Sequence, residues 1–304
     1  RSPAMLATAL GATAFLPGPQ ATQPLALAGR ARRATNAVST IAVFGASGRT
    51  GSEVVLQAME RGEKVSCLVR DRVKLKAPRD SAELGCTKGS MTNFTPTMVP
   101  DKMVRTEGSV LNRADVDDVF EGKDITGVVV ALGGKTREVG LTLCQDGTKH
   151  IIEACKKYGV KRITVVSSVG VGDSMDQAPW TFKILMKTMM QKIMDDKNAQ
   201  ENLFLDGPGA DLEFCILRPG GLKLGAPSGV VNVIDGEAGA INRADLAAFC
   251  LDAVLDPDFA YLQQAVCISS DMGSGFKSLM SDKTMSRMGS ELSRPLQDAN
   301  PFGF

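Results

Sequence analysis

The chain is 304 residues long, with 43% hydrophobic and 23% charged residues and a formal net charge of +1 at pH 7. This balance excludes the strongly basic footprint of a nucleic-acid-binding protein. Because no apolar run approaches the roughly 20 residues of a membrane-spanning helix, any membrane contact is expected to be peripheral. The seven scattered cysteines form no C-x-x-C pair and His150 is the only histidine, so we expect reduced core cysteines, no metal site and no Ser-His-Asp triad.

The N-terminal region has the composition of a targeting sequence. The first 52 residues contain five arginines and no Asp or Glu, together with many Ala, Thr, Pro and Leu residues. The apolar stretch 5–15, MLATALGATAF, is too short to span a bilayer and ends in small residues before Phe15, where a second, basic segment begins. This arrangement resembles the bipartite presequences of algae with secondary, red-lineage plastids. We therefore expect residues 1–38 to be a plastid presequence, with a mitochondrial presequence or an ordinary disordered N-terminus as alternatives.

Residues 39–51, STIAVFGASGRTG, predict a strand, a glycine turn and the start of a helix. Glycines at positions 45, 48 and 51 follow the apolar run 41–44, and residues 53–59 have a helical pattern. Glycine allows a tight turn and close approach of backbone N–H groups to a pyrophosphate, while the helix start adds unpaired donors and a positive dipole end. This context favours a dinucleotide site over an ordinary strand-to-helix turn.

The second predicted strand, 64–69, ends in Arg70. In a dinucleotide fold an acidic residue here favours NAD, whereas an arginine accommodates the 2′-phosphate of NADP. Arg70 therefore favours NADP, and Arg49 in the glycine loop is a second candidate for the phosphate clamp. A solvated basic loop is the alternative. Residues 77–102 then shift to Pro, Thr, Ser, Gly and Met and predict a loop-like insertion.

The rest of the chain alternates between strand and helix patterns. Strands are expected at 103–110, 125–131, 162–166, 212–217 and 265–269, and helices at 114–120, 141–158, 180–204 and 243–255. The methionines of the single long helix predicted over 180–204 are expected to be core residues rather than a substrate pocket. The series predicts an α/β fold, a Rossmann-type doubly wound parallel sheet in a single domain (39–271) with a small substrate region. Residues 272–304 are expected to form a flexible tail.

Six segments together resemble a known superfamily: IAVFGASGRTG, KVSCLVR, DGTKHIIEACKKYGVKRITVVSS, KNAQENL, DLEFCILRPGGL and NRADLAAF. They are similar to the atypical short-chain dehydrogenase/reductase superfamily, in particular to its NAD(P)H-binding group that includes flavin and biliverdin-IXβ reductases. The resemblance covers about residues 40–270. It implies one Rossmann-type domain with NADP(H) in the crevice and a small substrate region formed by the later helices and loops.

The resemblance also implies the cofactor contacts. Those at the phosphates are Gly45, Ser47, Gly48, Arg49, Thr50 and Gly51, with Arg70 at the 2′-phosphate. Leu132 and Gly133 would lie beside the nicotinamide ribose, and Ser167 and Ser168 near the reacting ring. Pro219 and Gly220 of the Arg-Pro-Gly-Gly segment would flank the nicotinamide from the far strand.

Two positions depart from the family pattern. Catalytic members of the wider superfamily carry Tyr-x-x-x-Lys, in which the tyrosine exchanges a proton with a substrate carbonyl. Lys197 stands at the lysine position, but Ile193 stands where the tyrosine would be, and neither Tyr158 nor Tyr261 has a lysine four residues later. After the third strand the chain has Gly108-Ser109 where relatives usually have Gly-Asp, which puts the adenine contact of the family in doubt.

The sequence thus favours an NADPH-dependent oxidoreductase that transfers a hydride to a flavin-, quinone- or tetrapyrrole-like acceptor. Solvent, Ser167 or Ser168 would supply the proton, and Lys197 is a further catalytic candidate. The alternative is a non-catalytic NADP-binding module that serves assembly or regulation of a larger plastid complex, for example a photosynthetic one. A scaffold without cofactor is a third reading. An open face near Ser167, Met186 and Met190 would favour the enzyme, and a face filled by side chains the module.

Overall fold

The computed structural model describes residues 25–26, 38–72, 75–78, 91–93, 103–134 and 140–270. The predicted tail at 272–304 lies outside the described residues, as do most of the predicted presequence and insertion. No helix within the described ranges is long and apolar enough to cross a membrane.

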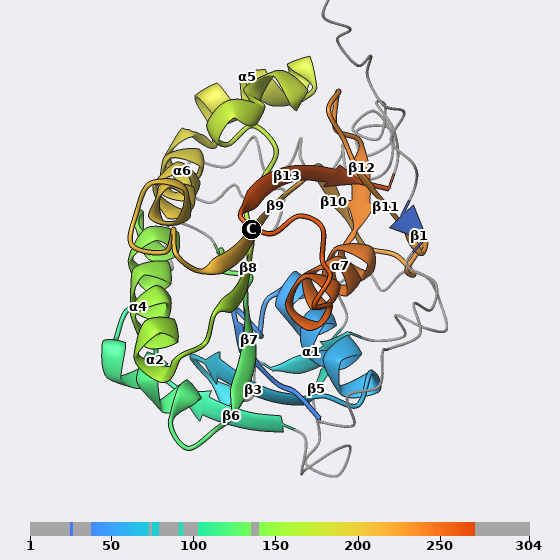
Figure 1. The fold of residues 1–304 in the computed structure, drawn as a ribbon. Helices are drawn as coiled ribbons and strands as arrows, with labels where there is room; N and C mark the ends of the chain where they lie inside the picture. The colour runs from blue at the N-terminus through green and yellow to red at the C-terminus, as the bar shows by residue number, and fades with distance from the viewer. Residues whose placement is uncertain are drawn as a thin grey trace, which may run out of the picture.

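A parallel sheet forms the centre of the molecule (Figure 1). Its seven parallel strands run in the spatial order β6 (Met103–Glu107), β3 (Lys64–Val69), β2 (Thr40–Phe44), β7 (Ile125–Val130), β8 (Arg162–Val166), β9 (Glu213–Pro219) and β13 (Gln264–Ser269). The chain winds outward in one direction from β2 and in the other from β7. The strand order therefore reverses between β2 and β7, which confirms the predicted doubly wound fold and marks the switch point where such sheets bind ligands.

Short strands that the sequence pattern did not predict extend the sheet or form small sheets beside it. β11 (Val230–Val233) pairs antiparallel with β13, and β1 (Leu25–Ala26), within the range predicted as presequence, pairs antiparallel with β11. Two small sheets consist of β10 (Gly221–Lys223) with β12 (Ala240–Asn242), and β4 (Lys76–Pro78) with β5 (Met91–Asn93). Strands of two to four residues are too short to show a periodicity.

Helices cover both faces of the sheet (Figure 1). α1 (Arg49–Glu60) and α7 (Arg243–Leu255) pack together on one face, and α2 (Arg113–Phe120), α4 (Leu143–Tyr158) and α6 (Gln191–Leu205) lie on the other. The side chains of β2 pack into the core on both faces of the sheet. Ile41 and Val43 belong to the first core cluster, and Ala42 and Phe44 to the second. All four side chains are fully buried, so the continuous apolar run reflects a strand with both faces covered.

The prediction of one long helix over 180–204 is wrong, because the chain forms two helices there. α5 (Trp180–Thr188), which follows the short 3₁₀ helix η2 (Gly172–Gln177), ends before Met189, and α6 begins after Met190. No glycine or proline marks this break. Tertiary packing imposes it, because α6 lies along α4 while Met186, Met190 and Met194 fill a third core cluster with Phe182 and other residues. The prediction that these methionines are core residues is confirmed.

The cysteines in the described ranges are buried and form no disulfide bonds, as expected for core residues. Burial raises the pKa of each of these thiols, for example that of Cys144 to about 11. They are therefore thiols rather than thiolates at neutral pH.

The packing at the start of α1 predicts a reversal of the usual helix preference. Alanine normally stabilises a helix interior by about 1 kcal/mol relative to glycine, but a Cβ on Gly51 would lie 2.1 Å from the Gly45 carbonyl oxygen. We expect Gly51→Ala to lower the free energy of unfolding by about 2 kcal/mol, measured by urea denaturation. Gly236→Ala is the control, since a Cβ there meets nothing within 4 Å. Equal stability of the two variants would contradict the tight packing.

Candidate functional site

The glycine loop closes tightly against the end of a neighbouring strand. Gly45 follows β2 with φ +82°, and a Cβ at this position would lie 2.2 Å from the Ala131 carbonyl oxygen. The Gly45 carbonyl in turn accepts a 2.9 Å hydrogen bond from the Gly48 N–H. Only glycine combines this left-handed backbone with such a close approach. The loop therefore lies at the switch point, directly beside the end of β7.

The N-terminus of α1 has the features of an anion site. Its N-cap residue is Gly48, no side chain caps it, and its first turn contains no acidic residue. Arg49 is exposed at the first helical position, Ser47 is half-buried, and Thr50 is buried in the same turn. Free backbone donors, the helix dipole and an arginine all favour a negative charge here. The predicted phosphate residues thus form a cradle that fits a pyrophosphate.

Two buried charged residues beneath this cradle were not found from the sequence. Glu53, on α1, is 8% exposed, and burial raises its pKa to about 7 against opposing effects of Gln57 and Arg243. Arg243, the first residue of α7, is 3% exposed. Burial and the nearby charge of Arg49 lower its pKa to about 10. The starts of α1 and α7 thus bring Arg49 and Arg243 close enough for their charges to interact. The Glu53 carboxyl group, whose pKa is raised, also interacts with the charge of Arg243.

The ends of β3 and β6 lie side by side. The Gly108 N–H donates a 2.9 Å hydrogen bond to the Val69 carbonyl, so the residues that follow both strands are neighbours. Arg70 is exposed there and forms no ion pair with any residue in the described ranges, whereas Arg72 lies 3.6 Å from Glu107. Asp115 of α2 accepts a 2.7 Å hydrogen bond from the Ser109 N–H. A carboxylate is therefore present beside Gly108-Ser109, but it comes from α2.

Lys197 is buried and hydrogen-bonded to other groups of the protein. Its side chain is 1% exposed, and its ammonium group donates to the Leu132 carbonyl (3.2 Å), the Val166 carbonyl (2.6 Å) and the Gln200 side-chain oxygen (3.1 Å). These bonds use all three donors of a lysine. The residue ties α6 to the ends of β7 and β8, where Leu132 and Ser167 follow the strands.

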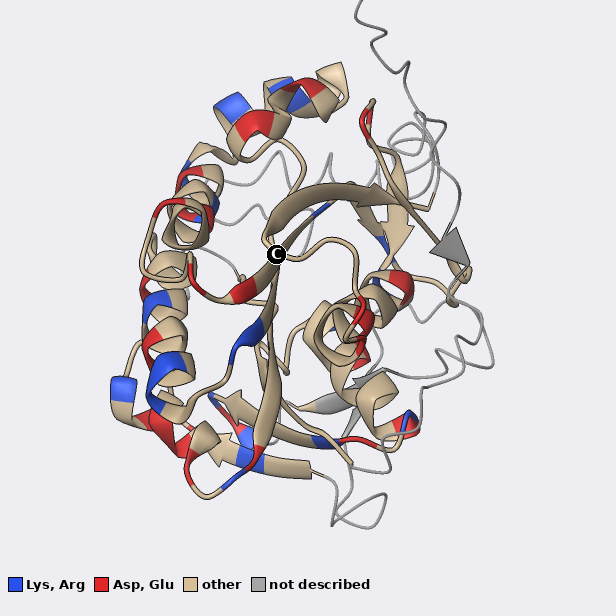
Figure 2. Cartoon of the chain, in the orientation of Figure 1, with Lys and Arg blue, Asp and Glu red and all other residues tan. Residues whose placement is uncertain are grey.

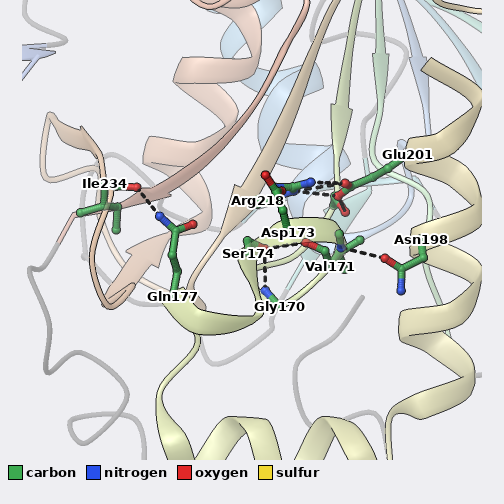
Figure 3. Close-up of polar contacts among 11 residues, drawn as sticks. Gly170, Val171, Asp173, Ser174, Gln177, Asn198, Glu201, Arg218 and Ile234 are labelled. Carbon is green, nitrogen blue, oxygen red and sulfur yellow. Dashed lines mark hydrogen bonds and ion pairs between the residues drawn. The ribbon is translucent and has the colours of Figure 1, made fainter. Parts of the chain in front are cut away.

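A buried ionic cluster follows the ends of β8 and β9 (Figure 3). Arg218 of β9 binds Glu201 of α6 through Nε (3.1 and 3.2 Å) and Nη2 (2.6 Å), and its Nη1 lies 2.5 Å from Asp173. Ser167 is fully buried and donates a 2.5 Å hydrogen bond to Glu201. Burial alone would lower the pKa of Arg218, but Glu201 raises it; Arg218 in turn lowers the pKa of Asp173. Glu201 thus links Arg218 to Ser167 and holds the serine hydroxyl in place.

The remaining predicted residues lie at the same end of the sheet. Ser168 is buried and donates to the Val169 carbonyl (3.1 Å). Pro219 ends β9, and its carbonyl accepts a 3.0 Å hydrogen bond from the Val169 N–H. At Gly220 a Cβ would lie 1.8 Å from the Gly239 carbonyl oxygen. The loops after β8 and β9 are therefore joined by backbone contacts.

Side chains fill the face near Ser167. Met186 is 2% exposed and Met190 is fully buried, and a Cβ on Gly170 would lie 2.4 Å from the Met186 sulfur. A pocket exists instead between the end of β7 and α6. Its lining includes Gly133, Gly134, Leu141, Cys144, Lys192, Ile193 and Lys197. Ile193 and Lys197, one turn apart on α6, share this pocket, so an apolar side chain stands where a tyrosine acid would be.

The ionic cluster predicts a large cost for removing one partner. Arg218 is 3% and Glu201 is 1% exposed. Arg218→Met leaves the Glu201 charge buried without its partner, and we expect a loss of about 3–5 kcal/mol in the free energy of unfolding. The double variant Arg218→Met/Glu201→Met should recover most of this loss. Lys156→Met, which removes an exposed ion pair with Asp211, should change stability little. A double variant no more stable than the single one would disprove the coupling.

The raised pKa of Glu53 predicts a pH-dependent stability. The carboxyl group has an ordinary pKa of 4.5 and a folded-state pKa of about 7. Between these values the folded chain binds more protons than the unfolded chain, so stability falls as pH rises through this window. We expect Glu53→Gln to be more stable than wild type at pH 8 by on the order of 2 kcal/mol, and nearly equal to it at pH 4. Thermal unfolding across this range tests it, with the exposed Glu121→Gln as control.

Comparisons with known proteins agree with this architecture. A family model described as NAD(P)H-binding matches residues 95–257, more than half of the chain. An uncharacterized chloroplastic protein of Arabidopsis thaliana is 28% identical over 243 residues, which cover 75% of this chain and 77% of that protein.

Two solved structures share the fold. One is ChuY, an anaerobillin reductase from Escherichia coli O157:H7, with a TM-score of 0.57 and 21% sequence identity. The match covers 77% of this chain and 98% of the ChuY chain. A short-chain dehydrogenase/reductase from Veillonella parvula, solved in complex with NADP, has a TM-score of 0.58 at 12% identity and covers 79% of this chain and 97% of its own. The chain belongs to the NAD(P)H-binding family.

Proposed function

We propose that this protein is an NADPH-dependent oxidoreductase that transfers a hydride to a flavin-, quinone- or tetrapyrrole-like acceptor. The observation that carries the proposal is the cradle at the switch point. Gly45 and Gly51 leave no room for side chains there, and the start of α1 is uncapped with Arg49 at its first position. NADPH bound in this crevice would supply the hydride, so the protein needs only to bind and orient its partners.

The preference for NADP rests on charge. Arg70 directly follows β3 and forms no ion pair with any described residue, and no acidic side chain stands at that position. Arg49 and the buried Arg243 add positive charge at the phosphate end of the crevice. An arginine pairs well with a phosphate dianion, whereas NAD offers only a hydroxyl at this point.

Proton delivery does not use a tyrosine in this proposal. Ile193 occupies the position one turn before Lys197, and both line the pocket after β7. Lys197 acts by holding the ends of β7 and β8 through its bonds to Leu132 and Val166. Solvent supplies the proton in this proposal, because Ser167 and Ser168 are buried and their hydroxyl groups donate to Glu201 and to the Val169 carbonyl. An acceptor that takes up a hydride and draws its proton from solvent suits a site without a strong general acid.

A second candidate is a non-catalytic NADP-binding module that serves a larger complex. The filled face favours it, because Met186 packs against Gly170 next to the buried Ser167. A module needs the cofactor cradle but no room for an acceptor. For both candidates we propose a plastid location, which the acid-poor N-terminal region and the chloroplastic relative support.

The decisive experiment titrates the full chain with NADPH and NADH, then adds flavin, quinone and linear tetrapyrrole acceptors while nicotinamide absorbance is recorded. Tight NADPH binding with oxidation by one acceptor class would establish the reductase. Tight binding without oxidation would favour the module, and absence of binding would disprove both.

The role of Arg70 has a separate test. We expect Arg70→Ala to weaken NADPH binding about tenfold or more, because a bidentate phosphate contact is lost, and to leave NADH binding nearly unchanged. Binding is measured by titration of nicotinamide fluorescence. Arg72→Ala is the matched control, since Arg72 lies two residues further on and faces Glu107. Equal losses for both cofactors would exclude the assignment to the 2′-phosphate.

A further inference from the structure

The outer face of α5 exposes two large apolar side chains. Trp180 is 69% exposed and is the single tryptophan of the chain, and Ile184, one turn later, is 55% exposed. The inner face of the same helix is also apolar, because Phe182 and Met186 are buried in the third core cluster. A surface helix usually has one apolar face. The outer Trp180 and Ile184 are therefore not explained by folding.

The charged side chains on the segment that carries this face are all basic. Residues 180–194 contain Lys183, Lys187 and Lys192 but no Asp or Glu. The lysines lie on α5 and at the start of α6, and Figure 2 shows both basic and acidic residues at this end of the molecule. Asp176 lies 3.6 Å from Lys183, but it is fully exposed, and such pairs are weak in water. The face is thus apolar, and the charged side chains that its own segment adds beside it are basic.

The face lies close to the crevice. α5 and the preceding η2 follow the end of β8, so α5 stands beyond the carboxyl ends of the strands (Figure 1). Leu141, which is 49% exposed, lines the pocket after β7 together with Lys192. Apolar and basic side chains therefore also border that pocket, together with Asp196, whose carboxylate accepts hydrogen bonds from the N–H groups of Cys144 and Gln145.

We propose that the outer face of α5 docks on an anionic membrane surface. Tryptophan is favoured at the boundary between headgroups and acyl chains, where its ring is buried and its N–H remains hydrated. Lys183, Lys187 and Lys192 would meet the anionic headgroups. Two exposed apolar side chains on one nine-residue helix fall well short of the roughly 800 Å² per partner of a stable protein interface. Such a face suits reversible membrane association better.

The single tryptophan makes the test direct. The full chain is mixed with vesicles of phosphatidylcholine alone or of phosphatidylcholine with phosphatidylglycerol, in the absence of nicotinamide cofactor. We expect co-sedimentation and a blue shift of Trp180 emission with the anionic vesicles only, both reduced by salt. Because no turnover is measured, the result is independent of the proposed function.

Variants locate the surface. Lys183→Glu/Lys187→Glu should weaken vesicle binding about tenfold or more, and Ile184→Ser should also weaken it. The controls are Lys149→Glu/Lys161→Glu, which reverses two exposed lysines away from α5, and Leu205→Ser at an exposed position of α6. Thermal unfolding of each variant is measured to check that it is folded.

Three outcomes would overturn the proposal. Failure to bind anionic vesicles excludes the membrane, and equal losses in the control variants exclude α5 as the contact. A blue shift that depends on protein concentration without lipid would assign the face to a second copy of the chain.

Discussion

The approach of the Gly45 backbone to the Ala131 carbonyl is the constraint on which the crevice depends. These atoms belong to the residues that directly follow β2 and β7, the strands at which the chain begins to wind in opposite directions. A side chain at Gly45 or Gly51 would push α1 away from the sheet and misplace the N–H groups at its start. Close backbone packing at one point thus sets both the sheet geometry and the anion site.

The other side of the crevice is held by α6. Lys197, Gln200 and Glu201 lie on one face of this helix and are buried. Lys197 bonds to carbonyls at the ends of β7 and β8, and Glu201 binds Arg218 of β9. Buried charges are costly unless paired, so each of these groups has a defined position. The buried groups on this side of the crevice are therefore held in place, and Lys197 and Ser167 are not free to react.

α5 links this side of the crevice to the surface. Its inner residues Phe182 and Met186 close the region beside Ser167, and its outer residue Trp180 faces solvent. Contact of the outer face with a membrane and access to the region beside Ser167 would therefore involve the same helix. This arrangement reconciles a filled face with a reductase, because an acceptor dissolved in a membrane would arrive at the element that covers the site.

The sequence by itself determined the layered α/β fold, the order of the main strands and the glycine cradle. These follow from local signals: apolar runs of strand length, glycines at three-residue spacing and helical periodicity, each of which depends on nearby residues. It did not predict the break between α5 and α6, since no glycine or proline stands at Met189-Met190 and only packing against α4 and the third cluster redirects the chain. It also missed the partners of Arg218 and the proximity of the buried Glu53 and Arg243, because residues distant in sequence meet only when helices and strands pack. Tertiary structure alone decided that Lys197 and Ser167 are buried and bonded to the protein, since burial depends on what covers a side chain.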